Sequence, residues 1–193
     1  MNVVALLLAA GSASRFGSDK LLHPLPHAVP IAVQAARHLK SVFDDDVFAV
    51  VRPGAKALSD LFLAEGCKLA VCENADEGMG ASLACAVRAA PDAEGFVVAL
   101  ADMPFIRAST IAAVRDAIAA GAPLAAPFFR ARRGHPVGIS ARFRGELERL
   151  RGDEGARNLL SNHAAELLKI PVGDPGVLRD IDTPSDLAPP VVV

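Results

Sequence analysis

The residues best suited to chemistry follow the first apolar run of the chain, in the segment VVALLLAAGSASRFGSDK. A stretch of strand length, Val3–Ala9, leads into Gly11 and small polar residues, and the cations Arg15 and Lys20 follow. Backbone N–H groups approach anionic oxygens closely only where side chains are small, and nearby cations neutralise the remaining charge. The segment therefore predicts a loop that binds the phosphates of a nucleoside triphosphate.

Two well-known phosphate loops do not fit this segment. The Walker pattern requires Gly-x4-Gly-Lys-Ser/Thr, but Lys20 falls three residues after Gly17 and no hydroxyl follows it. The dinucleotide fingerprint requires a second glycine where Ala13 stands, which disfavours a hydride-transfer enzyme. The remaining pattern, LAAGxxxRxGxxK after an N-terminal strand, resembles the signature loop of nucleotidyltransferases. The alternative is an ordinary turn whose charges face solvent.

A carboxylate follows a second apolar run, Phe96–Leu100, in the sequence Ala101-Asp102-Met103-Pro104. Strands of a parallel sheet present their carboxyl ends at one edge, so Asp102 should lie near the Gly11 loop. There it can bind Mg²⁺, which proteins hold through one or two carboxylates together with substrate phosphates. The alternative is an aspartate that caps the next helix.

Apolar runs alternate with helix-like stretches along the whole chain. The expected strands are Val3–Ala9, Val47–Val51, Leu69–Cys72, Phe96–Leu100, Leu124–Phe129, Pro136–Ser140 and Leu167–Val172. The expected helices are Ile31–Leu39, Ala55–Glu65, Ser82–Ala90 and Thr110–Ala120, the last ended by Gly121. This alternation predicts a single Rossmann-like α/β nucleotidyltransferase domain over residues 1–193, with a mainly parallel sheet and helices on both faces.

Composition restricts the partners and the compartment. A length of 193 residues with 52% hydrophobic content fits one compact domain, and the net charge of −2 argues against a nucleic-acid partner. No apolar run approaches the ~20 residues of a membrane-spanning helix. The start of the chain lacks the basic region of a signal peptide, so we expect a cytoplasmic protein. Three cysteines with no zinc spacing predict reduced, packed thiols.

Six segments together resemble one family, the molybdenum cofactor cytidylyltransferases, which belong to the nucleotidyltransferases that mature the molybdenum cofactor. They are LAAGSASRFGSDK, ADMP, GMGASL, GHPVGIS, GDEGARNLL and DIDTPSDL. The match extends from Val3 to Leu187. The first segment marks the broad superfamily, whereas GHPVG, GDEGAR and DIDTP indicate the molybdenum cofactor branch.

The resemblance implies transfer of CMP from CTP to the terminal phosphate of molybdenum-molybdopterin, giving molybdopterin cytosine dinucleotide and pyrophosphate. It implies Arg15, Lys20 and Asp102 as catalytic residues, and Asp102 and Asp182 as ligands of Mg²⁺. The implied nucleotide contacts are Leu8, Ala9, Ala10, Gly11, Ser12, Arg15, Gly17, Lys20 and Ser82. The implied acceptor contacts are Gly78, Gly80, His135 and Arg157. A molybdenum hydroxylase is the client protein that the resemblance suggests.

Several of these residues have a second interpretation. Thr183, Pro184 and Asp186 fit the first positions of a helix, so the carboxylates before them could serve a helix cap as well as a metal. Ser82 is also found at capped helix starts, which is the alternative to a ligand contact, and for His135 a structural role and a ligand contact are predicted alike.

The base is predicted from Ala10. In the family, Leu-Ala-Ala-Gly accompanies cytidine and Leu-Ala-Gly-Gly accompanies guanosine, and an added methyl group would narrow the room beside a purine. One methylene contributes only ~1–3 kcal/mol of discrimination. The alternatives are a related nucleotidyltransferase that uses GTP or another small phosphorylated acceptor, and a carrier that delivers the molybdenum cofactor to a molybdenum hydroxylase without turnover.

Overall fold

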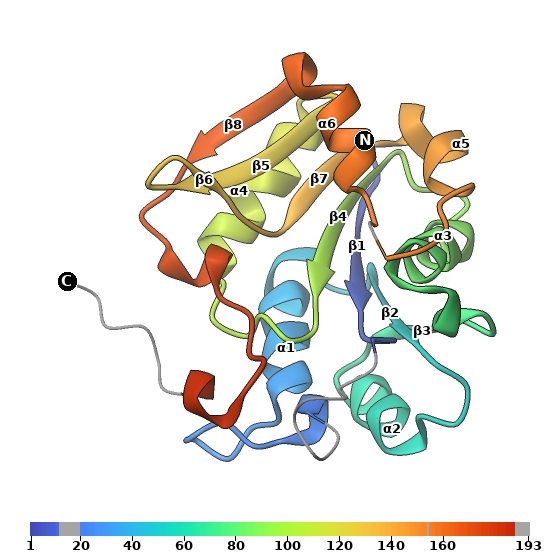
Figure 1. Cartoon of the computed structure of the whole chain (residues 1–193), viewed down its shortest axis with the longest axis vertical. Coiled ribbons are helices and arrows are strands. Elements are labelled where there is room, and N and C mark those ends of the chain that lie inside the picture. Colours follow the sequence, from blue (N-terminus) through green and yellow to red (C-terminus); the bar gives the residue numbers. More distant parts are fainter. Residues whose placement is uncertain (12–19, 154, 188–193) are drawn as a thin grey trace.

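One mixed sheet runs through the protein in the computed structural model, which describes residues 1–11, 20–153 and 155–187 (Figure 1). The strand order is β3-β2-β1-β4-β7-β5-β6, and β8 pairs with β5. The strands are β1 (Val3–Leu8), β2 (Val47–Val51), β3 (Lys68–Val71), β4 (Gly95–Leu100), β5 (Leu124–Phe129), β6 (Arg132–Arg133), β7 (Val137–Ser140) and β8 (Leu167–Pro171). The pairs among β1–β4 and the β5–β8 pair are parallel, whereas β7 and β6 run antiparallel to their neighbours.

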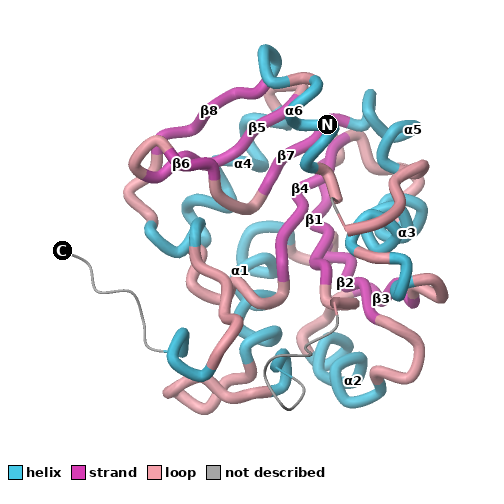
Figure 2. The backbone as a smooth tube through the Cα atoms, viewed as in Figure 1, coloured by secondary structure: helices cyan, strands magenta, loops and turns pink. Residues whose placement is uncertain are grey.

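Helices cover both faces of this sheet, as the tube view also shows (Figure 2). They are α1 (Ile31–Phe43), α2 (Lys56–Ala64), α3 (Met79–Ala89), α4 (Ala108–Ala119), α5 (Arg144–Leu147) and α6 (Arg157–Asn162). Apolar side chains of α1, α2 and α4 share one core cluster with the sheet, and those of α3, α5 and α6 share the other. This arrangement confirms the predicted α/β class.

The central strand β1 aligns the elements that carry the site. All six of its residues are buried, because neighbours flank it on both sides and helices cover both faces. In register, Leu8 lies beside Leu100 of β4 and beside Val50 of β2. The three strands therefore end at one edge of the sheet (Figure 1).

All seven expected strands and all four expected helices occur, with ends shifted by a few residues. Gly121 has a φ of 96°, and its N–H donates to the Ile118 carbonyl, as expected at the end of α4. The sequence reading missed β6, α5 and α6, each of which is six residues or shorter. Within the described residues, no helix is long and apolar enough to cross a bilayer.

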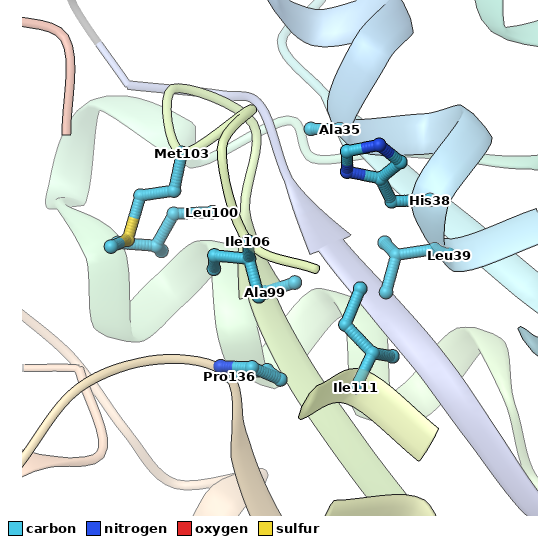
Figure 3. A pocket seen from close by; sticks show the side chains of 9 residues that line it. All are labelled: Ala35, His38, Leu39, Ala99, Leu100, Met103, Ile106, Ile111 and Pro136. Carbon is cyan, nitrogen blue, oxygen red and sulfur yellow. The ribbon is translucent and has the colours of Figure 1, made fainter. Parts of the chain in front are cut away.

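A small cavity lies between α1, the end of β4 and α4 (Figure 3). Its volume is about 10 Å³, which is about the space that one water molecule requires. His38 borders it, and burial lowers the pKa of this imidazole. The cavity is too small for a substrate, so it belongs to the packing of the core.

Candidate active site

A cleft of about 730 Å³ opens at the edge where β1, β2, β3 and β4 end. This volume lies in the range of small-molecule sites, and the edge is where ligands bind in open α/β sheets. The residues that line it are Leu8, Ala9, Ala10, Gly11, Lys20, Leu21, Arg52, Pro53, Glu73, Ala75, Asp76, Gly78, Met79, Ser82, Leu100, Asp102, Asp153 and Asp182.

Lys20 lies between two carboxylates in this cleft. Its Nζ donates to Asp102 Oδ2 at 3.0 Å and to Asp182 Oδ1 at 3.1 Å. The lysine side chain is 12% exposed, against 25% for Asp102 and 54% for Asp182. Burial alone would lower the pKa of Lys20, but the two carboxylates outweigh that effect and raise it. The ammonium group is therefore charged, and it joins residues that lie far apart in sequence.

Backbone contacts fix both carboxylates. Asp102 directly follows β4, and its carbonyl oxygen accepts a hydrogen bond from the N–H of Ile181. Asp186 Oδ2 accepts from the N–H groups of Thr183 and Asp182, at 2.8 and 3.2 Å. The short helical turn over Pro184–Leu187 thus has the predicted capping contact, and this contact also holds the backbone of Asp182. The helix-cap interpretation of this segment is confirmed, and the role of Asp182 as a metal ligand stays a prediction.

The carboxylates fit a divalent cation. Asp102 Oδ1 is buried and has no hydrogen-bond partner among the described residues. A buried carboxylate oxygen without a partner is unfavourable, and a metal ion would satisfy it. The described residues include no cluster of three or more His, Cys, Asp or Glu side chains that could bind a metal alone. That pattern suits Mg²⁺, which takes one or two carboxylates and completes its shell with phosphate and water.

The start of the predicted phosphate loop is held in the sheet. Ala9 and Ala10 are buried, and the N–H of Ala9 donates to the Val50 carbonyl at 3.0 Å. Among the described residues, a Cβ atom on Gly11 would have no neighbour within 4 Å, so their packing does not require glycine there. Gly11 lines the cleft, and the described residues around it leave room for a ligand to reach its backbone. Ser12, Arg15 and Gly17 lie outside the described residues.

Arg52 is a cleft residue that sequence reasoning missed. It follows β2, and its Nη2 donates to the carbonyl oxygen of Ala10 at 2.7 Å. The position of Arg52 in the sequence could have predicted this placement. A cation directly after a buried strand lies at the same edge of the sheet as Gly11 and Asp102.

The wall opposite the carboxylates comes from the start of α3. Gly78 and Ser82 line the cleft, as the sequence led us to expect. Gly78 is the N-cap residue of α3, so Ser82 lies within the helix, where its hydroxyl donates to the Gly78 carbonyl at 3.4 Å. Gly80 does not line the cleft. A Cβ atom there would lie 2.6 Å from the carbonyl oxygen of Arg151, so this glycine allows close packing of backbone on backbone.

Residues 5–167 match the family model of the MobA-like NTP transferase domain. The chain belongs to this family. The purine catabolism protein PucB of Bacillus subtilis (strain 168) is 31% identical over 196 residues, covering 95% of this chain and 93% of PucB. The crystal structure of Rv0371c from Mycobacterium tuberculosis H37Rv has a TM-score of 0.84 at 27% identity, covering 96% of this chain and 94% of Rv0371c. A complex of Rv0371c with manganese has a TM-score of 0.80 at 26% identity, covering 96% of each chain.

These matches confirm the predicted family, the molybdopterin nucleotidyltransferase-like NTP transferases, and the protein is a nucleotidyltransferase. The cleft lies where the fold of a MobA-like NTP transferase presents the ends of its central strands. Among its charged side chains, Lys20, Asp102 and Asp182 lie together and suit the binding of phosphates and a metal ion.

Besides Gly80, two further predicted acceptor residues of this MobA-like chain, Arg157 and His135, lie outside the described lining of the cleft. Arg157 is exposed at the start of α6. His135 lies just before β7 and is half-buried. Burial, and then the charge of Arg133, lower the pKa of His135 to about 4, so its imidazole is neutral at neutral pH. Its Nδ1 is buried and has no hydrogen-bond partner within the described part of the chain.

Proposed function

We propose that the protein transfers CMP from CTP to the terminal phosphate of molybdenum-molybdopterin in a Mg²⁺-dependent reaction. The products are molybdopterin cytosine dinucleotide and pyrophosphate. The observation that carries this proposal is the placement of Lys20 between Asp102 and Asp182 at the mouth of the cleft. An ammonium group and two carboxylates at one point suit a metal-bound triphosphate, and the family is that of NTP transferases.

In the proposed reaction, an oxygen of the acceptor phosphate attacks the α-phosphorus of CTP while the bond to the β-phosphate oxygen breaks. The chain needs no covalent intermediate, because positioning and charge stabilisation supply most of the catalysis. Asp102 and Asp182 would hold Mg²⁺, which neutralises charge on the phosphate oxygens when it is bound. Lys20 would stabilise the α-phosphate and the departing pyrophosphate. The backbone at Gly11, together with Arg15, would hold the rest of the triphosphate.

The nucleoside would lie over Leu8, Ala9 and Ala10, with Ser82 on the facing wall. Both Ala10 and Ser82 line the cleft, which supports this arrangement. In the family, alanine at position 10 accompanies cytidine, and its methyl group leaves less room beside a purine. We therefore propose CTP rather than GTP as the nucleotide substrate.

The acceptor would approach past Gly78 and the neighbouring backbone of Gly80, with His135 and Arg157 as further candidate contacts. A basic turn lies at the other edge of the sheet, beside β6, and offers cations to an anionic group. Arg130 and Lys169 line an open groove where β5 and β8 end, and the exposed Arg132 and Arg133 follow in β6. Guanidinium groups suit the phosphate of a pterin, because they can donate two parallel hydrogen bonds.

The test is to incubate the purified protein with Mg²⁺, molybdenum-loaded molybdopterin and either CTP or GTP, and to follow pyrophosphate and the dinucleotide product. CTP-dependent formation of the cytosine dinucleotide supports the proposal, and preference for GTP would overturn the assigned base. Pyrophosphate release with a sugar phosphate but not with molybdopterin would overturn the acceptor. Because PucB is named a purine catabolism protein, a purine-oxidising molybdenum hydroxylase is the client to test first for receipt of the product.

A further inference from the structure

The two cations described in the cleft lie on opposite sides of β1. Lys20 contacts Asp102, which follows β4, whereas Arg52 follows β2. β4 and β2 flank β1 in the sheet. Since neighbouring strands are ~4.8 Å apart, the ends of β2 and β4 are separated by about 10 Å. If the triphosphate lies beside Lys20 and the carboxylates, the base has to lie on the β2 side, within reach of Arg52.

The side chain of Arg52 is held beside the start of the phosphate loop. Its Nη2 donates to the Ala10 carbonyl, and this contact uses one of the five N–H donors of a guanidinium group. The following residue, Pro53, also lines the cleft and restricts the backbone of Arg52 to extended conformations. Arg52 therefore places a planar set of donors at the position where the sequence predicts base selection.

This geometry distinguishes the bases by the pattern of atoms on their edges. A guanidinium fork donates two parallel hydrogen bonds, so it needs two adjacent acceptors. Cytosine offers O2 and N3, and guanine offers O6 and N7. Uracil carries an N–H at N3 between its two carbonyl groups, and adenine has an amino group beside each of N1 and N7, so neither of them presents such a pair.

We propose that Arg52 is a specificity-determining residue that donates a pair of hydrogen bonds to the base and selects CTP and GTP over UTP and ATP. The inference rests on the nucleotide site of the proposed function but does not depend on the acceptor. Ala10 then discriminates between cytosine and guanine by their size. Arg52 discriminates between these two bases and the bases that lack a pair of adjacent hydrogen-bond acceptors.

The test measures binding of CTP, GTP, UTP and ATP to the full chain by titration calorimetry, with Mg²⁺ and without acceptor. Arg52→Gln should reduce the ratio of CTP to UTP affinity by roughly tenfold or more, because a paired contact to a base contributes about 1–3 kcal/mol. Arg52→Lys should lose discrimination as well, since an ammonium group cannot donate two parallel hydrogen bonds in one plane. Arg88→Gln is the matched control, because Arg88 is exposed and also donates to a backbone carbonyl, that of Glu148.

Three results would contradict the assignment. Equal loss of affinity for all four triphosphates in Arg52→Gln would make Arg52 a phosphate contact. A lower melting temperature with an unchanged CTP to UTP ratio would limit its role to holding Ala10. Failure of the wild type to bind any triphosphate would overturn the proposed function together with this inference. By contrast, base-selective binding without transfer to molybdopterin would overturn only the acceptor and would support the role of Arg52.

Discussion

The backbone N–H of Ile181 donates a hydrogen bond to the carbonyl oxygen of Asp102 at 2.9 Å. Ile181 is fully buried between two exposed carboxylate residues, Asp180 and Asp182. Its side chain therefore anchors the C-terminal segment in the core, while its backbone joins that segment to the end of β4. The distance between the two candidate metal ligands, Asp102 and Asp182, depends on this one apolar residue.

Ile181→Ala should lower both the stability and the metal affinity of the protein. Removal of a buried isoleucine side chain to alanine costs about 2–5 kcal/mol, and the segment that carries Asp182 would lose its anchor. We expect a lower free energy of unfolding in urea and a higher Mg²⁺ concentration for half-maximal pyrophosphate release. Ile181→Val, with an expected cost of about 0.5–1.5 kcal/mol, is the control. An unchanged Mg²⁺ requirement in a destabilised Ile181→Ala variant would show that Ile181 does not position the site.

Asp102→Asn should reduce turnover on the order of 10²-fold or more while leaving the fold intact. The amide keeps the shape of the side chain but loses the charge that the proposed metal requires, and loss of one group that stabilises transition-state charge has effects of this size. Pyrophosphate release is the measurement. The control is Asp60→Asn, which removes a carboxylate from the exposed pair with Lys56 on α2. Wild-type turnover in Asp102→Asn would remove Asp102 from the metal site.

Lys20→Gln should abolish most turnover and yet strengthen the binding of a divalent cation to the nucleotide-free protein. The ammonium group lies 3.0 Å from Asp102 Oδ2 and 3.1 Å from Asp182 Oδ1, so it competes for the oxygens that a metal would use. Titration with Mn²⁺, followed by electron paramagnetic resonance, measures the affinity directly. Weaker Mn²⁺ binding in Lys20→Gln than in the wild type would mean that the lysine organises the carboxylates rather than competing with the metal.

The sequence predicts those parts of the site that depend on a buried strand and the residue after it. Gly11 and Asp102 follow long apolar runs, so the common edge of a parallel sheet brings them together without further information. The partnership of Lys20 with Asp182 is a contact between residues 162 positions apart, which no local pattern encodes. The family resemblance gave the two residues separate roles, and the contact between them was not predicted.

Short elements and individual side-chain contacts were harder to predict. The strand β6 has two residues, and the turn before it places Arg130 and Ala131 at φ values of 48° and 63° without a glycine. Tertiary pairing with β5 stabilises this turn against its local preference. The contact of Arg52 with Ala10 was missed for a similar reason, because an arginine after a strand is ordinary until the neighbouring strand is placed.

Two glycine substitutions should separate folding from nucleotide binding. Gly11→Ala places a methyl group where no atom of the described residues lies within 4 Å, so the melting temperature should stay close to that of the wild type while CTP affinity falls. Gly80→Ala places a methyl group 2.6 Å from the Arg151 carbonyl oxygen, and overpacking of this kind costs about 1–3 kcal/mol. Thermal unfolding and CTP titration of both variants provide the measurement. Undiminished CTP affinity in Gly11→Ala would contradict a close approach of the nucleotide to the backbone at Gly11.

His135 should make the protein less stable in mild acid. Burial, and then the charge of Arg133, lower the pKa of its imidazole to about 4 in the folded state, whereas the unfolded value is ~6.5. The unfolded chain therefore binds the proton first as the pH falls. The contribution of His135 to stability is complete above pH ~6.5 and is lost progressively towards pH 4. Over this range, the free energy of unfolding should fall more steeply for the wild type than for His135→Gln.

Urea unfolding at several pH values between 7.5 and 4.5 measures this difference directly. Carboxylates that titrate in the same range affect the wild type and His135→Gln alike, so the difference between the two curves isolates the imidazole. His27→Gln, at an exposed position, is the matched control for loss of a histidine. Parallel curves for the wild type and His135→Gln would mean that the His135 ring is protonated as readily in the folded protein as in the unfolded chain. Its buried Nδ1 would then need a partner in the folded state.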